Sequence, residues 1–190
     1  QVLIKKNNSI LIEYLTVPVK MLAVTLQATN NQTSRFEYQL DPTIGSWYHI
    51  ALVKNGVNVA LFLDGQKVIN STYLGTIQDG GSSEPWDIGA NRAGGTDYFN
   101  GYIDEVRIVA SAVYTEVFTP AHHQFFPTQE HAITSNDNYA NQVDLLLHFE
   151  EVDGSDLVDS SSTDASVALD AGSLNSDNAR FGSKSLSVPA

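Results

Sequence analysis

The stretch Ser46–Pro120 decides the fold class of this 190-residue chain: it contains SWYHIALVKNG (46–56), LFLDGQKVI (61–69), EPWDIGAN (84–91) and NGYIDEVRIVASAVYTEVFTP (100–120). Short apolar runs alternate here with turn residues. Asn55-Gly56 and Asp64-Gly65 are the dipeptides that tight β-hairpins prefer, because such turns need positive φ angles. The stretch therefore predicts a meander of short antiparallel strands, with one continuous strand over Tyr102–Val109.

The flanking sequence continues the β pattern. Strand-like runs at 1–45 precede the decisive stretch, and 141–190 contains further short runs, beginning with Asp144–Phe149. No long helical period is visible. Many short strands with frequent glycine turns favour an all-β fold, which we predict to be a two-sheet antiparallel jelly-roll sandwich.

Composition limits the possible partners. The chain has 22 acidic and 10 basic residues, a formal net charge of -12. Such a surface repels phosphate backbones, so we expect no nucleic-acid partner. No apolar run reaches the roughly 20 residues that a membrane-spanning helix needs, so no membrane insertion is expected. There is no cysteine, which excludes disulfides and thiolate metal sites.

The four motifs of the decisive stretch, in this order, resemble the laminin G-like domains of the concanavalin A-like lectin/glucanase class, of the bacterial or phage type. The Trp47-Tyr48-His49 strand, the Leu-Asp-Gly hairpin at 63–65 and the GYIDEVRI run at 101–108 carry the resemblance. It implies a non-catalytic adhesion or structural module of a multidomain virion-surface, cell-surface or extracellular protein. The neighbours would be glycan or another structural protein, within a larger assembly. An accessory carbohydrate-binding domain of a secreted polysaccharide-degrading enzyme is the alternative.

The C-terminal part adds a complication, because VDLLLHFE (143–150) and ARFGSKSLSV (179–188) resemble the way such a domain begins. We therefore expect residues 1–120 to be a jelly roll without its first strands, 121–140 to be a linker, and 141–190 to hold the opening strands of a second jelly roll. In an alternative interpretation, the C-terminal strands fold back and complete the sheet in permuted order. The long linker favours the first interpretation. The start at Gln1 suggests a mature product or an excised part of something larger.

Candidate glycan-binding residues lie near the loops of the decisive stretch: Trp86, Asn91, Arg92 and Tyr98. An aromatic ring offers a sugar a large apolar face, and the polar neighbours could hydrogen-bond hydroxyls. Core packing is the competing interpretation for Trp86.

The resemblance also implies a structural Ca²⁺ with Asp104 as a ligand, and Asp97 and Asn100 are nearby oxygen donors of the kind this ion binds. Alternatively, Asp104 accepts backbone hydrogen bonds or pairs with Arg107. No enzyme is expected: in the glucanase pattern Glu-X-Asp-X-Glu, the run from Glu151 places Ser155 where the second glutamate would stand, and retaining hydrolysis needs both carboxyls.

Overall fold

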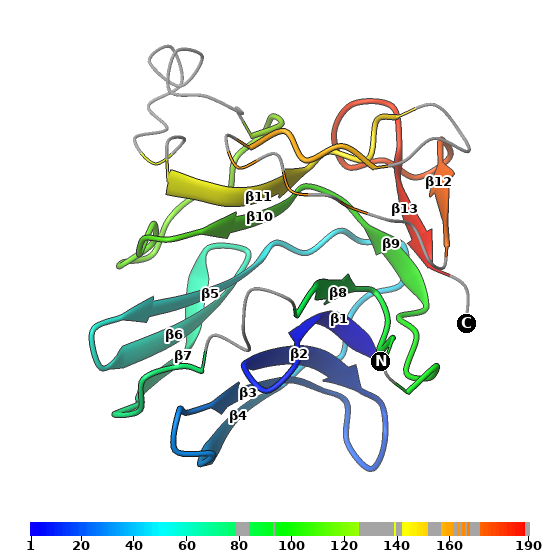
Figure 1. Ribbon diagram of the computed structural model, residues 1–190. Coiled ribbons are helices and arrows are strands. Elements are labelled where there is room, and N and C mark those ends of the chain that lie inside the picture. The colour runs from blue at the N-terminus through cyan, green and yellow to red at the C-terminus, as the bar shows by residue number, and fades with distance from the viewer. Residues whose placement is uncertain are drawn as a thin grey trace. The chain divides into compact units, whose positions relative to one another are not determined.

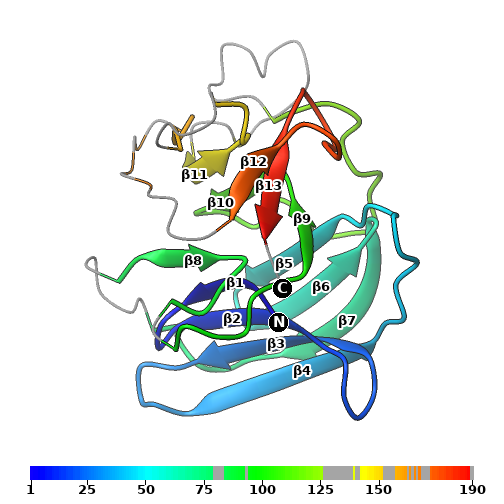
Figure 2. The same cartoon turned by 90° about the vertical axis from the view of Figure 1, so that its right-hand side faces the viewer.

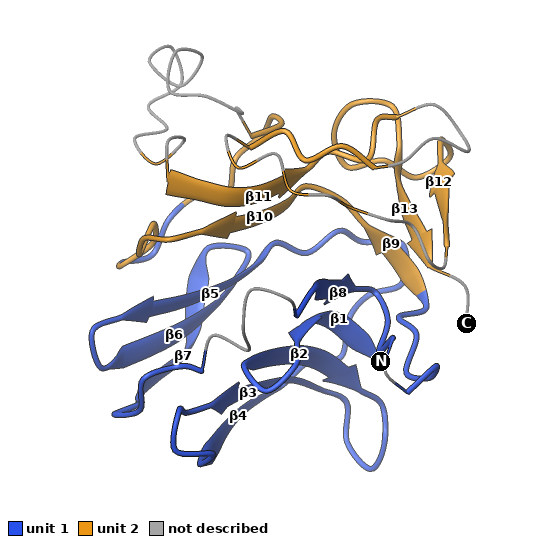
Figure 3. Ribbon diagram, viewed as in Figure 1, with its two compact units in different colours: residues 1–100, 116–118, 190 blue, residues 101–115, 119–189 orange. Residues whose placement is uncertain are grey.

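The computed structural model describes residues 1–78, 84–92, 94–125, 139, 142–151, 157–161, 163, 165, 167 and 172–188. These residues form antiparallel sheets and contain no α-helix (Figure 1). Within them, no helix has the length and apolarity needed to cross a bilayer. The chain divides into two compact units, one comprising residues 1–100, 116–118 and 190, the other residues 101–115 and 119–189 (Figure 3).

Unit 1 contains a five-stranded sheet in the order β4-β3-β2-β1-β8 and a three-stranded sheet in the order β5-β6-β7 (Figure 2). The strands of the larger sheet are β1 (Val2–Lys6), β2 (Ile10–Leu15), β3 (Met21–Gln27), β4 (Thr33–Gln39) and β8 (Trp86–Ile88). Those of the smaller sheet are β5 (Ile50–Asn55), β6 (Asn58–Leu63) and β7 (Gln66–Thr72).

The core of unit 1 follows from the period-two alternation of strands that have one buried face. Leu22, Val24 and Leu26 of β3 have no exposed surface, and they pack with Val59 and Leu61 of β6. The two sheets therefore share one apolar core, which is how an antiparallel sandwich buries its inner faces.

The predicted hairpin turns are confirmed, with one shift of position. Asp64 and Gly65 both have positive φ (49° and 79°), as expected for the two central residues of a type I′ turn. Between β5 and β6, the two-residue loop is Gly56-Val57, one residue later than predicted. Gly56, at φ 57°, is the first central residue, the position at which glycine favours a type II′ turn.

Unit 2 contains strands that are distant in sequence. β9 (Gly101–Ile103) pairs with β13 (Ser185–Val188), which pairs with β12 (Ser173–Asn175); β10 (Val106–Val109) pairs with β11 (Val143–Leu147). Val143, Leu146 and Leu147 are almost completely buried, so β11 supplies much of the apolar interior of this unit.

The prediction of one strand over Tyr102–Val109 is wrong. The strand is interrupted at Asp104 and Glu105, because Glu105 takes a left-handed backbone conformation with φ 54°. That conformation ends the extended run and turns the chain between β9 and β10. The alternation of the sequence gives no sign of this break.

The strand pairing bears on the two interpretations of the C-terminal part. β9 and β10, which the sequence assigns to the domain 1–120, pair with β13 and β11 from the segment 141–190. β9 and β10 thus find their partners in the C-terminal segment, in two- and three-stranded sheets separate from those of unit 1, and both interpretations stay open. The predicted boundaries themselves stay a prediction, since most of 121–140 lies outside the described residues.

Candidate functional site

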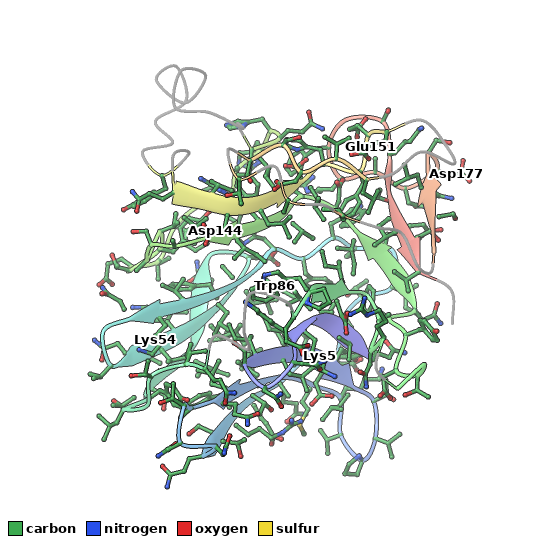
Figure 4. The ribbon with its side chains drawn as sticks, viewed as in Figure 1. Lys5, Lys54, Trp86, Asp144, Glu151 and Asp177 are labelled. Atoms are coloured by element: carbon green, nitrogen blue, oxygen red, sulfur yellow. The ribbon has the colours of Figure 1, made fainter. Side chains whose placement is uncertain are left out.

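Strands β1 and β8 pair antiparallel, and we call this two-stranded unit the β1–β8 ribbon. Its two faces separate the candidate glycan-binding residues. Lys5 lies opposite Asp87, and Lys6 lies opposite Trp86. Because successive side chains of a strand point to opposite faces, Trp86 and Lys6 share one face and Asp87 and Lys5 share the other. The Lys6 ammonium lies 5.7 Å from the centre of the Trp86 ring, in a cation–π contact. Figure 4 labels Lys5 and Trp86 on this ribbon.

The loop that follows β8 is closed by backbone hydrogen bonds. Asn91 and Thr96 form an isolated β-bridge, and the Asn91 carbonyl accepts hydrogen bonds from the amides of Gly94 (3.1 Å) and Gly95 (3.0 Å). Gly95 (φ 60°) and Asp97 (φ 64°) occupy the left-handed region, which lets the chain reverse within a few residues. The loop is thus held by its own backbone.

Side chains tie this loop to the outer face of the ribbon. Lys5 Nζ donates to Asn91 Oδ1 (2.7 Å), and Asn91 Nδ2 donates to Asp97 Oδ2 (3.4 Å). The buried carboxylate of Asp87 accepts from the backbone N–H of Arg92 (3.2 Å) and lies 3.7 Å from the Arg92 guanidinium. The Arg92 side chain nevertheless remains 54% exposed, so it is available to a ligand.

The structure brings together only part of the predicted ligand set. Asn91 and Arg92 lie with Lys5 and Asp87 on one face, whereas Trp86 belongs to the opposite face of the ribbon. Trp86 is half-buried and lies outside the principal apolar cluster of unit 1, while Tyr98, also half-buried, follows the loop. Lys5 and Asp87 are members of this polar group that the sequence analysis missed, since only the β1–β8 pairing reveals them.

Two of the three residues predicted to bind calcium, Asp97 and Asp104, accept hydrogen bonds from protein groups. Asp97 Oδ2 accepts from Thr96 Oγ1 (3.1 Å), while Asp104 accepts backbone N–H groups, as the alternative interpretation expects. Asp97 and the exposed Asn100 belong to unit 1, and Asp104 belongs to unit 2. Among the described residues, no three His, Asp or Glu side chains cluster so as to hold a metal ion. The calcium site stays a prediction that these contacts do not favour.

Unit 2 contains a titratable cluster that the sequence analysis missed. His148 Nδ1 and Glu105 Oε1 lie 2.7 Å apart in a nearly buried pair. Burial lowers the pKa of His148, but the hydrogen bond to Glu105 and the nearby charges of Asp104 and Glu150 outweigh burial and raise this pKa above its usual value. The two partners are 43 residues apart, so sequence spacing offered no signal for the pair.

Two carboxylates hold the segment that leads into β13. Asp104 Oδ2 accepts from the backbone N–H groups of Arg180 (2.8 Å) and Phe181 (3.0 Å). Glu150 accepts from the Ser183 hydroxyl (2.6 Å) and from the backbone N–H groups of Ser183 and Lys184. A Cβ at position 182 would meet the Glu150 carboxylate, and the φ of 62° also favours glycine.

These contacts shift the two carboxyl groups in opposite directions. Burial raises the pKa of Asp104 to about 6, even though its backbone hydrogen bonds act in the other direction. Burial also acts to raise the pKa of Glu150, but the hydrogen bonds from Ser183 and Lys184 prevail, so this pKa is lowered. Protons therefore bind more tightly at Asp104 and His148 in the folded state, and less tightly at Glu150.

We expect the free energy of unfolding of unit 2 to be highest near pH 4 to 4.5 and to fall as the pH rises. The contribution of Asp104 is lost as the pH rises from about 4 through its folded-state pKa of about 6, and that of His148 is lost above about pH 6.5. Below about pH 4.5, the carboxylate of Glu150 is protonated and its contribution is lost. Between pH 5.5 and 8 we expect a loss of about 1 kcal/mol, after allowance for solvent screening.

Urea unfolding followed at several fixed pH values measures this dependence. The His148→Gln variant removes one titrating group and should show a shallower decline between pH 5.5 and 8. Stability of unit 2 that rises over this range would contradict the assignment of the shifts.

The fold and the contacts above define an all-β, antiparallel protein of the concanavalin A-like class. The family model described as the concanavalin A-like lectin/glucanases superfamily, in its laminin G-like form, matches residues 1–116, more than half of the chain. The chain belongs to this family. No curated protein and no solved structure matches it.

Membership of this family sets the broad functional class. A laminin G-like domain fits a carbohydrate-binding or adhesion module, is typically non-catalytic and is usually extracellular, although the superfamily also includes glucanases. The matched residues contain the whole β1–β8 ribbon and the loop that follows it.

Proposed function

We propose that this chain is a non-catalytic, glycan-binding adhesion module of a multidomain protein on a virion or cell surface, or in the extracellular space. The observation that carries the proposal is the backbone-closed loop after β8, where Arg92 remains exposed although its backbone is fixed by buried Asp87. A rigid loop that presents a polar side chain suits recognition of hydroxyl groups, since little conformational entropy is lost on binding.

Two carboxylates that lie close to each other in unit 1 take part in an ion-pair network. This arrangement supports a binding role and argues against hydrolysis of a glycosidic bond by this pair. Glu13 and Glu37 lie on either side of β3, and both accept hydrogen bonds of 2.7 Å from the Arg35 guanidinium. A guanidinium between two carboxylates serves an ion-pair network, whereas a glycosidase leaves the space between its two carboxyls for the sugar and water. Asp153 and Ser155, from the incomplete glucanase pattern, lie outside the described residues.

A glycan array tests the proposal. We expect micromolar binding to at least one glycan, weakened at least tenfold by Arg92→Ala, because a polar contact to a bound sugar contributes about 1.5 kcal/mol. Lys20→Ala is the matched control: it removes an exposed cation, from the turn between β2 and β3, and should leave binding unchanged.

Trp86→Ala separates the two faces of the ribbon. Loss of binding in this variant, with Arg92→Ala unaffected, would move the site to the face of Trp86 and Lys6. If no glycan on the array binds, the proposal of glycan binding is contradicted, and a structural role in the assembly is the remaining function.

The second candidate is an accessory carbohydrate-binding domain attached to a polysaccharide-degrading enzyme, which the presence of glucanases in the superfamily favours. The open reading frame around this chain distinguishes the candidates. An adjoining hydrolase domain supports the accessory role, and a neighbourhood of viral structural genes supports the virion module.

A further inference from the structure

β4 is an edge strand with an unpaired long side. It pairs with β3 over all seven residues from Thr33 to Gln39, without a register shift, and no described strand pairs with its other side. Figure 2 shows β4 at the end of the five-stranded sheet. The strand contains neither proline nor glycine, and it lacks the bulge that often protects such edges from pairing.

The hydrogen bonds on either side of β4 determine which of its backbone groups face outward. Leu40 N donates to Lys20 O (3.1 Å), and Ala28 N donates to Gln32 O (2.8 Å). In an antiparallel ladder, hydrogen-bonded positions alternate, so the even-numbered residues of β4 bond to β3. The N–H and C=O groups of the odd-numbered residues, among them Arg35 and Glu37, therefore point toward the unpaired side.

The charges on β4 are arranged with two-fold symmetry about Phe36. Arg35 and Glu37 are exposed and lie on the outer face of the sheet, one on each side of Phe36. If a second copy of β4 pairs antiparallel with Phe36 opposite Phe36, each Arg35 lies directly opposite a Glu37 of the other copy. The backbone N–H and C=O groups of Arg35 and Glu37 also point toward the unpaired side. In this register, the same residues therefore form both the hydrogen bonds and the charge pairs between the two copies.

The neighbouring symmetric registers are disfavoured by charge. Pairing centred on Arg35 places two guanidinium groups opposite each other, and pairing centred on Glu37 does the same with two carboxylates. Like charges directly opposite across antiparallel strands are destabilising, whereas opposite charges contribute roughly 0.2–1 kcal/mol a pair. Only the register centred on Phe36 pairs the outward-facing backbone groups and also places opposite charges directly across from each other.

Arg35 is already ordered for such a contact. Its Nε donates to Glu37 and its Nη1 donates to Glu13 and to Thr25 Oγ1 (3.1 Å), which fixes the guanidinium over the outer face. A guanidinium has five N–H groups, so further donors remain for a carboxylate of the second copy. On the inner face, Phe36 packs against the core of unit 1 while still half-exposed, and an added strand would cover it.

We propose that β4 is the interface of a symmetric dimer, in which two copies of this chain pair their β4 strands antiparallel about Phe36 and join their five-stranded sheets. The occupant of the edge is thus a second copy, selected by the alternation of Arg35 and Glu37. This assembly is independent of the glycan site proposed above.

Charge reversal tests the register. In sedimentation equilibrium at about 0.15 M salt, we expect the chain to dimerise, and Arg35→Glu or Glu37→Arg to weaken the dimer at least tenfold, because each variant alone places like charges opposite each other. An equimolar mixture of the two variants restores complementary pairs and should form a heterodimer. Lys20→Glu, which breaks an exposed ion pair with Asp41, is the matched control and should leave the dimer unchanged.

Cysteine cross-linking provides a second measurement in this cysteine-free chain. Phe36→Cys should form a disulfide between copies, since the non-hydrogen-bonded central pair brings the two Cα atoms to about 4.5 Å. Ser34→Cys lies opposite Tyr38 of the second copy and should not cross-link. A chain that stays monomeric at about 0.5 mM, a dimer that survives both charge reversals, or efficient cross-linking through Ser34→Cys would overturn the proposal.

Discussion

Phe62→Ala is expected to destabilise unit 1 by about 3–5 kcal/mol, the range for truncating a fully buried aromatic side chain. Phe62 has no exposed surface, on the central strand of the three-stranded sheet. Its ring packs edge-on against Phe118 at 5.4 Å and has the Lys67 ammonium 5.6 Å from its centre. The substitution leaves a cavity that two neighbouring strands cannot easily close.

Urea unfolding monitored by hydrogen exchange of the β5–β7 amides measures this loss in unit 1 itself. Ile44→Ala is the matched control, because Ile44 is 100% exposed and its truncation should change stability by less than about 0.5 kcal/mol. A loss below 1 kcal/mol for Phe62→Ala would show that burial of this ring contributes little to the stability of unit 1.

Asp159→Ala should destabilise unit 2 by about 3 kcal/mol, because it removes a buried acceptor and leaves buried donors without partners. The carboxylate, in a residue only 5% exposed, accepts from the backbone N–H groups of Leu146 (2.9 Å), Ser161 (2.9 Å) and Ala165 (2.8 Å), and from the Ser161 hydroxyl (2.8 Å). Burial would raise the pKa of Asp159, but these hydrogen bonds lower it.

The same exchange experiment, read at the amides of β11, reports on unit 2. Asp144→Ala is the matched control, since Asp144 is an exposed carboxylate on β11 itself. Equal effects of the two substitutions would mean that Asp159 is a solvated side chain and not a buried acceptor.

Local patterns predicted the parts of the fold that depend on neighbouring residues. The β5–β7 meander and its turns follow from glycine and aspartate at positions that need positive φ, and strand-like runs at 1–45 were predicted where β1 to β4 lie. β8 escaped prediction because it is three residues long, and it becomes a strand through its pairing with β1.

The candidate sites were less predictable, because they depend on contacts across long sequence separations. Asn91 and Arg92 were identified from the sequence, whereas Lys5, their neighbour 86 residues from Asn91, was not. The pairing of β8 with β1 places Trp86 on the opposite face from Asp87, and the sequence alone does not say which face lies toward the loop. Glu105 was placed in a regular strand, although its left-handed conformation brings its side chain to His148.

The pairing of β10 with β11 has a practical consequence for anyone who expresses this protein in pieces. The family match ends at residue 116, yet Val106–Val109 obtains its hydrogen-bonding partner from Val143–Leu147. A fragment trimmed to the matched residues would contain the apolar strand β10 without its pairing partner β11. The unpaired edge of such a strand promotes aggregation. Because β9 likewise pairs with β13, the unit that can be studied in isolation extends at least to β13, well beyond the limits that the family match suggests.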